Sequence, residues 1–217
     1  MTGAMKLTLH SAWRSSAAYR VRIGLNLKGL AYDVVPVNLV ANQHLEPAYA
    51  ALNPQRLLPT LEVGGRTLTQ SLAILEWLDE TAPEPPLLPT DPFDRATVRA
   101  MAEIIACDIH PVNNLRILRA LTGLGVDEPG RDVWIQRWIT DGFAALEPLI
   151  VERGKGFAFG DAPGLADCCL VPQVYNAERF KTDLTPFPAI RAVAARAVEH
   201  PAFAAAHPNL QPDALHA

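Results

Sequence analysis

The chain has 217 residues, of which 49% are hydrophobic and 19% charged, and its formal net charge is −4. This length is enough to bury a full core in one large or two small domains. The negative charge argues against nucleic acid or an anionic membrane as the main partner. No N-terminal run resembles a signal peptide and no apolar stretch approaches the ~18 residues that span a bilayer, so a cytoplasmic protein is expected.

The first patterned segment predicts a strand that turns into a helix. Leu7 and Leu9 alternate with polar neighbours, which is typical of a half-buried strand. Ser15 or Ser16 then stands at the N-cap of a helix with one apolar face, and Gly29 is its C-terminal stop. A helix N-terminus offers unpaired N–H groups and a partial positive charge, so it can hold an anion such as a thiolate. The alternative is that the serine only caps the helix.

Strands and helices continue to alternate after this helix. The expected elements are a strand over 33–39, a short helix over 46–52 and a hairpin of strands over 60–63 and 66–69. Pro36 indicates an edge position for its strand, and Gly64-Gly65 between two alternating runs is a hairpin signal. Ser71 can cap the next helix. The order βαβ, hairpin, helix predicts a small α/β domain.

A proline-rich stretch divides the chain. Five prolines lie between residues 83 and 92, and proline continues neither a helix nor a central strand. We therefore expect an inter-domain linker, with one domain over 5–85 and a second over 93–210.

The second domain is expected to be all-helical. Its helical periodicity is found over residues 93–122, 131–153 and 165–181. Pro111 and Pro172 fall inside two of these segments, where each should remove a backbone hydrogen bond and bend its helix. The tail from Pro208 has no periodicity and is expected to be a loose arm or a strap over the surface.

The sequence does not contain the residue patterns of disulfide-rich, metal-binding or several common catalytic proteins. The three cysteines, Cys107, Cys168 and Cys169, do not form a disulfide framework and are expected to be small core residues. The six histidines are scattered, so no metal site is expected. The sequence contains no C-x-x-C, H-E-x-x-H, phosphate-binding loop or G-x-S-x-G motif.

Four patterns together resemble one family over nearly the whole chain. A small α/β domain, a proline linker and a helical domain in this order resemble the cytosolic glutathione transferases. Residues 14–23 are similar to the zeta-class signature, and Asn53-Pro54, Pro59-Thr60-Leu61 and Gln70-Ser71 stand at the family's spacing. Residues 107–116 resemble the corresponding segment of bacterial maleylpyruvate and maleylacetoacetate isomerases.

The resemblance implies a fold and a reaction. The expected fold is a thioredoxin-like βαβ-ββα domain that binds glutathione, followed by an all-α domain that binds the substrate. The expected activity is a cis–trans isomerisation of a dicarboxylate, maleylpyruvate or maleylacetoacetate, with glutathione as cofactor and a homodimer as the assembly. The alternatives are a transferase that conjugates or dehalogenates small electrophiles, and a non-catalytic glutathione-binding protein.

The resemblance also implies a catalytic group. Ser15 would donate to the glutathione sulfur, with Arg14 and Ser16 beside it. Ala17 stands where the family carries a cysteine, so no protein thiol at that position can take part. Gly164 replaces the usual Ser or Thr N-cap of a later helix, although Asp167 remains at the third helical position to accept backbone N–H bonds.

Six further residues are expected to contact glutathione by resemblance: His44, Leu58, Pro59, Gln70, Ser71 and Asn113. A cis bond before Pro59 would leave the backbone of Leu58 free to pair with the cysteinyl unit. Gln70 and Ser71 open a helix and suit the γ-glutamyl carboxylate. The alternatives are that Ser71 is a plain cap and that His44 is an ordinary surface histidine.

Arginines are expected to anchor the carboxylates of the substrate, because a planar guanidinium binds a carboxylate at two points. Arg14, Arg116 and Arg179 stand where the resembling isomerases also carry arginine. The alternative for Arg116 and Arg179 is a surface salt bridge. Arg20 and Arg22 are expected to be solvated or structural residues of the first helix.

Overall fold

The computed structural model describes residues 6–216 and divides the chain into two compact units. The first unit runs to Leu87 and also includes the segment from Pro201 onward, and the second spans Leu88–His200. The expected boundaries, 5–85 and 93–210, differ from this division mainly in the segment after Pro201. Residue 5 lies outside the described residues.

A four-stranded mixed sheet forms the centre of the first unit. Its strands are β1 (Leu7–Ser11), β2 (Asp33–Pro36), β3 (Thr60–Val63) and β4 (Arg66–Thr69). They lie in the order β2-β1-β3-β4, with β1 parallel to β2 and the other pairs antiparallel. This is the expected thioredoxin-like α/β fold, and β2 occupies an edge as Pro36 indicated. The strand stops at Pro36 instead of continuing to residue 39.

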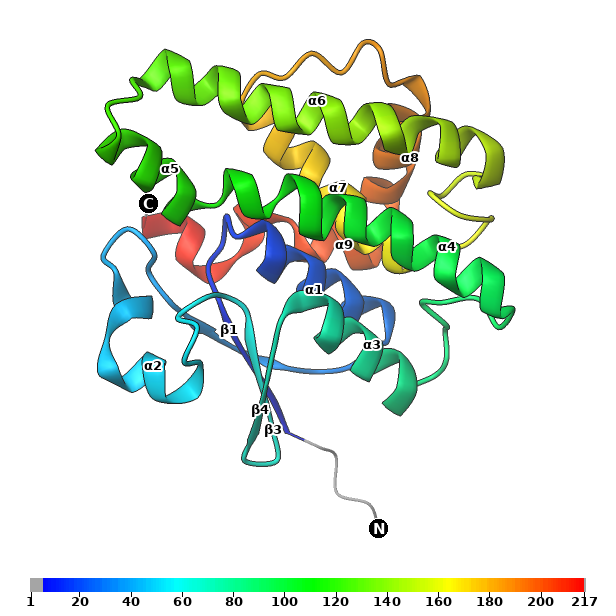
Figure 1. The fold of residues 1–217 in the computed structure, drawn as a ribbon. Helices are drawn as coiled ribbons and strands as arrows, with labels where there is room; N and C mark the ends of the chain where they lie inside the picture. The colour runs from blue at the N-terminus through cyan, green and yellow to red at the C-terminus, as the bar shows by residue number, and fades with distance from the viewer. Residues whose placement is uncertain (1–5, 217) are drawn as a thin grey trace. The chain divides into compact units, whose positions relative to one another are not determined.

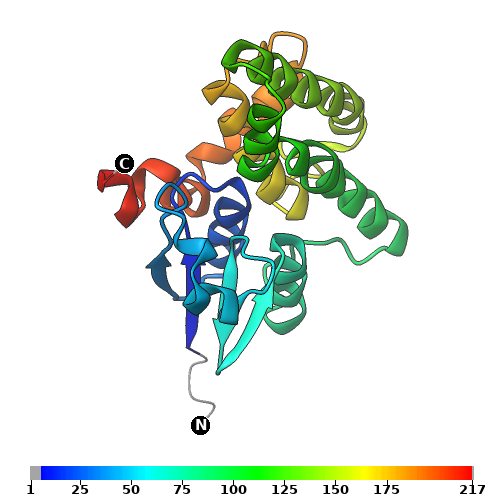
Figure 2. The same ribbon diagram turned by 60° about the vertical axis from the view of Figure 1, so that its left-hand side comes forward.

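In the part of the first unit that the structure describes, the sheet is accompanied by four α-helices: α1 (Ser16–Leu27), α2 (Pro47–Leu52), α3 (Ser71–Thr81) and α9 (Pro201–Ala206). α1 packs against both α3 and α9, whereas α2 lies apart from α1 and α3 (Figures 1 and 2). Gly24 allows the close approach of α1 to α3, because a Cβ at this position would lie 2.2 Å from Cδ2 of Leu75. Gly29 follows α1 with φ 62°, as expected for a C-terminal stop.

The described residues of the second unit are mostly helical, as expected. Its α-helices are α4 (Pro92–Glu103), α5 (Leu115–Gly123), α6 (Glu128–Arg153), α7 (Leu165–Arg179) and α8 (Pro188–Glu199). The single helix expected over 93–122 is wrong. After α4 the chain forms a π-helix over Ile104–Ile109 and a 3-10 helix over Pro111–Asn113 before α5 begins. Pro111 therefore opens a turn instead of bending a helix, while Pro172 does lie inside α7.

α7 is the most buried helix of the second unit, and it packs against α4 and α8. Cys168 and Cys169 lie in its core as expected, whereas Cys107 on the π-helix is exposed, so its placement in the core was wrong. Within the described residues, no helix combines the length and the apolar character needed to cross a membrane.

Candidate functional site

The strand register brings three chain segments of the first unit to one end of the sheet. His10, near the end of β1, pairs with Thr60, and Thr60 pairs with Thr69 at the end of β4. The loop after β1, the residue before β3 and the residue after β4 therefore meet at this end. These positions carry Ser15, Pro59 and Gln70.

Ser15 is the N-cap of α1, and its Oγ accepts a hydrogen bond from the Ala18 N–H at 3.2 Å. Accepting this bond leaves the hydroxyl proton of Ser15 available for donation, so capping and thiol binding are compatible roles. The first turn of α1 contains no acidic residue, so no carboxylate there offsets the positive end of the helix dipole. Ser15 is half-buried, whereas Ser16 is the first helical residue and is buried. Ser15 is thus the better-placed donor.

Arg14 precedes this cap and is exposed. Its guanidinium lies 4.5 Å from the ring centroid of Trp13, a cation–π distance. The contact restrains a long side chain beside the start of α1, where its positive charge adds to that of the helix dipole.

The segment before β3 has the backbone geometry that the resemblance implied. The Leu58–Pro59 peptide bond is cis. The carbonyl of Leu57 accepts two hydrogen bonds, both 2.7 Å long, from the Tyr49 hydroxyl and the Asn53 side-chain amide. Burial raises the pKa of Tyr49, so the phenol keeps the proton that it donates. The role of Tyr49 could not be found from the sequence, since nothing local links it to Leu57.

Gln70 and Ser71 begin α3. Gln70 is the N-cap with φ 68°, and a positive φ is uncommon for a residue other than glycine. The expectation that Ser71 caps the helix is wrong, because it is the first helical residue. Its Oγ instead accepts a hydrogen bond from Nη1 of Arg20 at 3.2 Å. The Gln70 amide is exposed and donates to Oε1 of Gln55 at 2.7 Å.

Arg20, Arg22 and His44 are buried, which excludes the solvent-exposed positions considered for them. Arg20 and Arg22 are 2% and 0% exposed, so they are structural and not solvated. His44 lies in the 3-10 helix Gln43–Leu45 and is buried, so it is not an ordinary surface histidine. Its expected contact with glutathione stays a prediction.

The remaining predicted residues belong to the second unit. Asn113 ends a 3-10 helix, and its amide lies 3.5 Å from the Ile135 carbonyl. Arg116 lies in the first turn of α5 and Arg179 is the last residue of α7, and both are exposed. Arg179 also lies over the ring of Phe180, at 5.4 Å from its centroid. Both guanidinium groups are exposed, and a guanidinium can bind a carboxylate at two points.

One strongly shifted acid lies in the second unit. Asp167 is buried in the first turn of α7 and accepts hydrogen bonds from the N–H groups of Gly164 (2.9 Å) and Ala158 (2.7 Å). Burial raises its pKa to about 6, because the desolvation cost of the charge exceeds the gain from these bonds. The expectation that Asp167 accepts backbone N–H bonds is confirmed, and its surroundings indicate a structural role.

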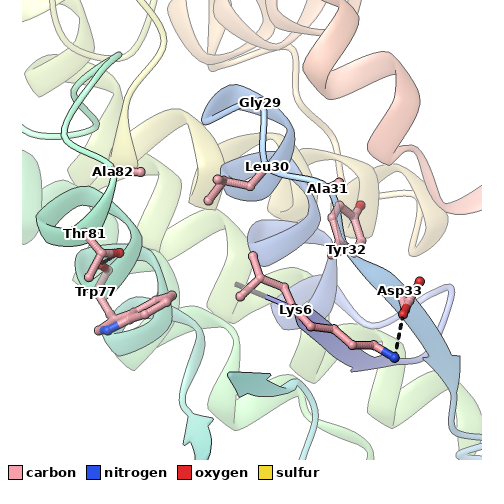
Figure 3. A pocket seen from close by; sticks show the side chains of 10 residues that line it. Lys6, Gly29, Leu30, Ala31, Tyr32, Asp33, Trp77, Thr81 and Ala82 are labelled. Carbon is pink, nitrogen blue, oxygen red and sulfur yellow. Dashed lines mark hydrogen bonds and ion pairs between the residues drawn. The ribbon is translucent and has the colours of Figure 1, made fainter. Parts of the chain in front are cut away.

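A pocket of about 490 Å³ in the first unit lies away from these residues (Figure 3). The residues that line it lie near the start of β1 and the C-terminal ends of α1 and α3. Leu30, Tyr32 and Trp77 are among its larger side chains, and Lys6 and Asp33 form an ion pair of 3.4 Å at its edge. Ser15 and Ser71 stand at the opposite ends of those helices. The pocket is therefore separate from the candidate site. Among the residues that the structure describes, no group of three His, Cys, Asp or Glu side chains could hold a metal ion.

Comparisons with known proteins show the family of the chain. A family described as "Glutathione S-transferase, N-terminal domain" matches residues 9–86. The maleylpyruvate isomerase of Ralstonia sp. is 50% identical, over 95% of this chain and 99% of that protein.

Two solved structures are similar to this chain over nearly its whole length. One is a holo maleylpyruvate isomerase described as a zeta-class bacterial glutathione S-transferase, with a TM-score of 0.93, 50% identity and coverage of 95% of this chain and 99% of that one. The other is the maleylacetoacetate isomerase of Anaeromyxobacter dehalogenans with bound dicarboxyethyl glutathione and citrate (TM-score 0.88, 48% identity, 97% and 98% coverage). The chain therefore belongs to the glutathione transferase family, in the zeta-class group that contains these isomerases.

Proposed function

We propose that this protein is a glutathione-dependent cis–trans isomerase that converts maleylpyruvate or maleylacetoacetate into the fumaryl isomer. The observation that carries the proposal is the Ser15 hydroxyl, which caps α1 and still has a proton to donate, in a chain 50% identical to a maleylpyruvate isomerase. A protein that only binds glutathione would not need such a donor at the sulfur.

The first unit supplies groups that suit each part of glutathione. The N-terminus of α3, with Gln70 and Ser71, fits the γ-glutamyl carboxylate, and the backbone of Leu58 fits the cysteinyl unit. His44 is proposed for the glycyl end and Asn113 for a further contact. The sulfur then lies at the N-terminus of α1, beside Ser15.

The chemistry requires the thiol to be ionised. A free thiol titrates near ~8.5, so lowering its pKa to about 6.5 stabilises the thiolate by roughly 2.7 kcal/mol. The Ser15 hydroxyl, the dipole of α1 and the Arg14 guanidinium together can supply this amount. Ser16 is a secondary donor, since it is buried.

Bound glutathione supplies a thiolate whose reversible addition to the cis double bond allows rotation about that bond and returns the thiol unconsumed. Arg116 and Arg179, together with Arg14, hold the two carboxylates of the substrate. Their positive charge also stabilises the negative charge that develops on the conjugated carbonyl oxygen during addition. Ala17 takes no part, so the protein contributes no thiol of its own at that position.

The proposal is tested with catalytic glutathione. Micromolar glutathione should support conversion of a large molar excess of maleylpyruvate or maleylacetoacetate, while the total free thiol stays constant. Dialysed enzyme should be inactive until glutathione is restored. Loss of one thiol per product would instead show a conjugating transferase, and conversion by thiol-free enzyme would refute the role of glutathione.

We further propose that the protein is a cytoplasmic homodimer, as the resemblance implies. The described cysteines form no disulfide with one another, which fits a reducing compartment. Sedimentation equilibrium measures the assembly: a mass near 23.6 kDa would indicate a monomer and exclude the dimer.

A further inference from the structure

Both peptide groups of Trp13 are held by side chains from elsewhere in the first unit. The Trp13 N–H donates to Oδ2 of Asp213 at 2.9 Å, although the two residues are 200 positions apart in the chain. The Trp13 carbonyl accepts a hydrogen bond from Nη2 of Arg22 at 3.1 Å. Trp13 lies two residues before Ser15, in the loop between β1 and α1.

Arg22 connects this loop to two other segments. Its Nη1 donates to the Ser11 hydroxyl at the end of β1, and its Nε donates to the Ala206 carbonyl at the end of α9, each at 3.0 Å. The side chain is 0% exposed and its guanidinium lies 5.2 Å from the ring centroid of Tyr19. Three nitrogens in one plane thus fix three chain segments, which a lysine amine at one point could not reproduce.

The C-terminal segment that carries Asp213 is itself fastened to the first unit. α9 packs along α1, where the Asn26 side chain donates to the Ala202 carbonyl at 2.9 Å (Figure 1). The Gln211 amide then bonds back to the carbonyls of Ala205 and His207. The segment after Pro208 is therefore a strap and not a loose arm, and it places Asp213 beside Trp13.

We propose that Arg22 and Asp213 are positioning residues for Ser15. By fixing both peptide groups of Trp13, they set the path of the loop that ends at the cap, where the Ser15 N–H completes a turn with the Ala12 carbonyl at 3.0 Å. A hydrogen bond to sulfur depends on the placement of its donor, so loosening the loop weakens thiolate stabilisation. The inference rests on the proposed function, because it assumes that Ser15 binds the glutathione sulfur.

Three full-length variants test the strap contact. Asp213→Ala removes the acceptor, Asp213→Asn keeps a carbonyl oxygen in its place, and Asn209→Ala is the control, since it alters an exposed side chain of the same segment. Hydrogen exchange in the glutathione-free protein measures the Trp13 amide directly. Asp213→Ala should speed its exchange about fivefold or more, corresponding to the loss of one hydrogen bond, while the other two variants should stay within about twofold of the unmodified chain.

The functional consequence is measured by titrating the thiol of bound glutathione through its thiolate absorbance. Asp213→Ala should raise the pKa of that thiol and lower turnover at neutral pH about threefold to fivefold, and Asp213→Asn should restore both. Arg22→Lys should act in the same direction and more strongly, because three contacts are lost. A purely structural role would lower the melting temperature without moving the thiol pKa.

The outcomes distinguish failure of the positioning role from failure of the proposed function. If the unmodified chain binds glutathione with a depressed thiol pKa and Asp213→Ala leaves that pKa unchanged, the positioning role is refuted while the proposed function stands. If the unmodified chain does not bind glutathione, the proposed function fails and the inference fails with it.

Discussion

Two helices of this protein begin in contrasting ways. α1 is capped by the half-buried Ser15 hydroxyl and has no acidic residue in its first turn. α7 begins at Gly164, which has no hydroxyl, and places the buried carboxyl group of Asp167 in its first turn. In α1 the Ser15 Oγ accepts the Ala18 N–H and no carboxylate lies in the first turn, so the positive end of the helix can meet an anionic ligand. In α7 the Asp167 carboxyl group accepts the N–H of the cap residue Gly164, so the helix start carries an acidic group of its own.

The two helix starts are expected to serve different purposes, ligand binding in α1 and folding stability in α7. A helix start that binds a ligand needs an accessible donor and no competing anion, and α1 has both. A helix start at the centre of a core needs an internal acceptor, which Asp167 supplies. Changes at α1 should therefore alter catalysis more than folding, and changes at α7 should do the reverse.

The largest effect is expected at Asp167, on stability and its pH dependence. Because burial raises the pKa of Asp167 to about 6 in the folded protein, from an ordinary value of 3.8, the native state binds the proton more tightly than the unfolded state does. The stabilising contribution is therefore fully present below the unfolded pKa and is lost as the pH rises through about 6. Between about pH 4.5 and about pH 7.5 the loss should be about 2 kcal/mol.

Urea unfolding of the unmodified chain and of Asp167→Asn at these two pH values measures this effect. The amide does not titrate, so the destabilisation caused by Asp167→Asn should be larger at the lower pH. Equal destabilisation at both pH values would show that the pKa of Asp167 in the folded protein does not lie near 6. The thiol pKa of bound glutathione should be the same in both proteins.

At α1 the expected effect is on turnover. Ser15→Ala should lower turnover at neutral pH at least tenfold, about 1.4 kcal/mol, because the donor to the thiolate is lost. The lost cap should cost about 1 kcal/mol of folding stability. Ser16→Ala should be milder, since Ser16 lies inside the helix. Equal activity of the two variants across a pH series would refute the role of Ser15.

The sequence predicted the region around α1 well, because its signals are local. Alternation in β1, the serine cap and the glycine after α1 each act within a few residues, and the Gly64-Gly65 hairpin follows the same principle. Two helices between residues 182 and 207 were not predicted. Pro188 and Pro201 open α8 and α9, where the missing N–H has no cost.

Long-range contacts of the site could not be predicted. Trp13 and Asp213 lie at opposite ends of the chain, and neither Tyr49 nor Arg20 carries a local sign of its hydrogen-bond partner. Arg20 is instructive, since an arginine on an amphipathic helix is usually solvated. Only the packing of α1 against α3 explains its burial.

A smaller effect is expected at the exposed arginines of the second unit. Arg116→Ala and Arg179→Ala should each raise the KM for the dicarboxylate about fivefold, roughly 1 kcal/mol, since exposed charge pairs are weakened by solvent. Glutathione affinity should be nearly unchanged. A small neutral electrophile is the control, and an equal loss of reactivity toward it would show that the arginines do not anchor carboxylates.

The smallest effect returns to the contrast between the two helix starts. Gly164→Ser would give α7 the hydroxyl that α1 already has, in the extended backbone conformation that an N-cap requires. The new hydroxyl can accept the Asp167 N–H, while the Asp167 carboxyl group keeps its bond from the N–H of residue 164. Since glycine is only slightly worse than serine at this position, the gain should be a few tenths of a kcal/mol. Thermal unfolding measures this gain, with Gly164→Ala as the control, because it adds a methyl group without the hydroxyl. Equal melting temperatures for the two variants would show that the added hydroxyl does not stabilise the start of α7.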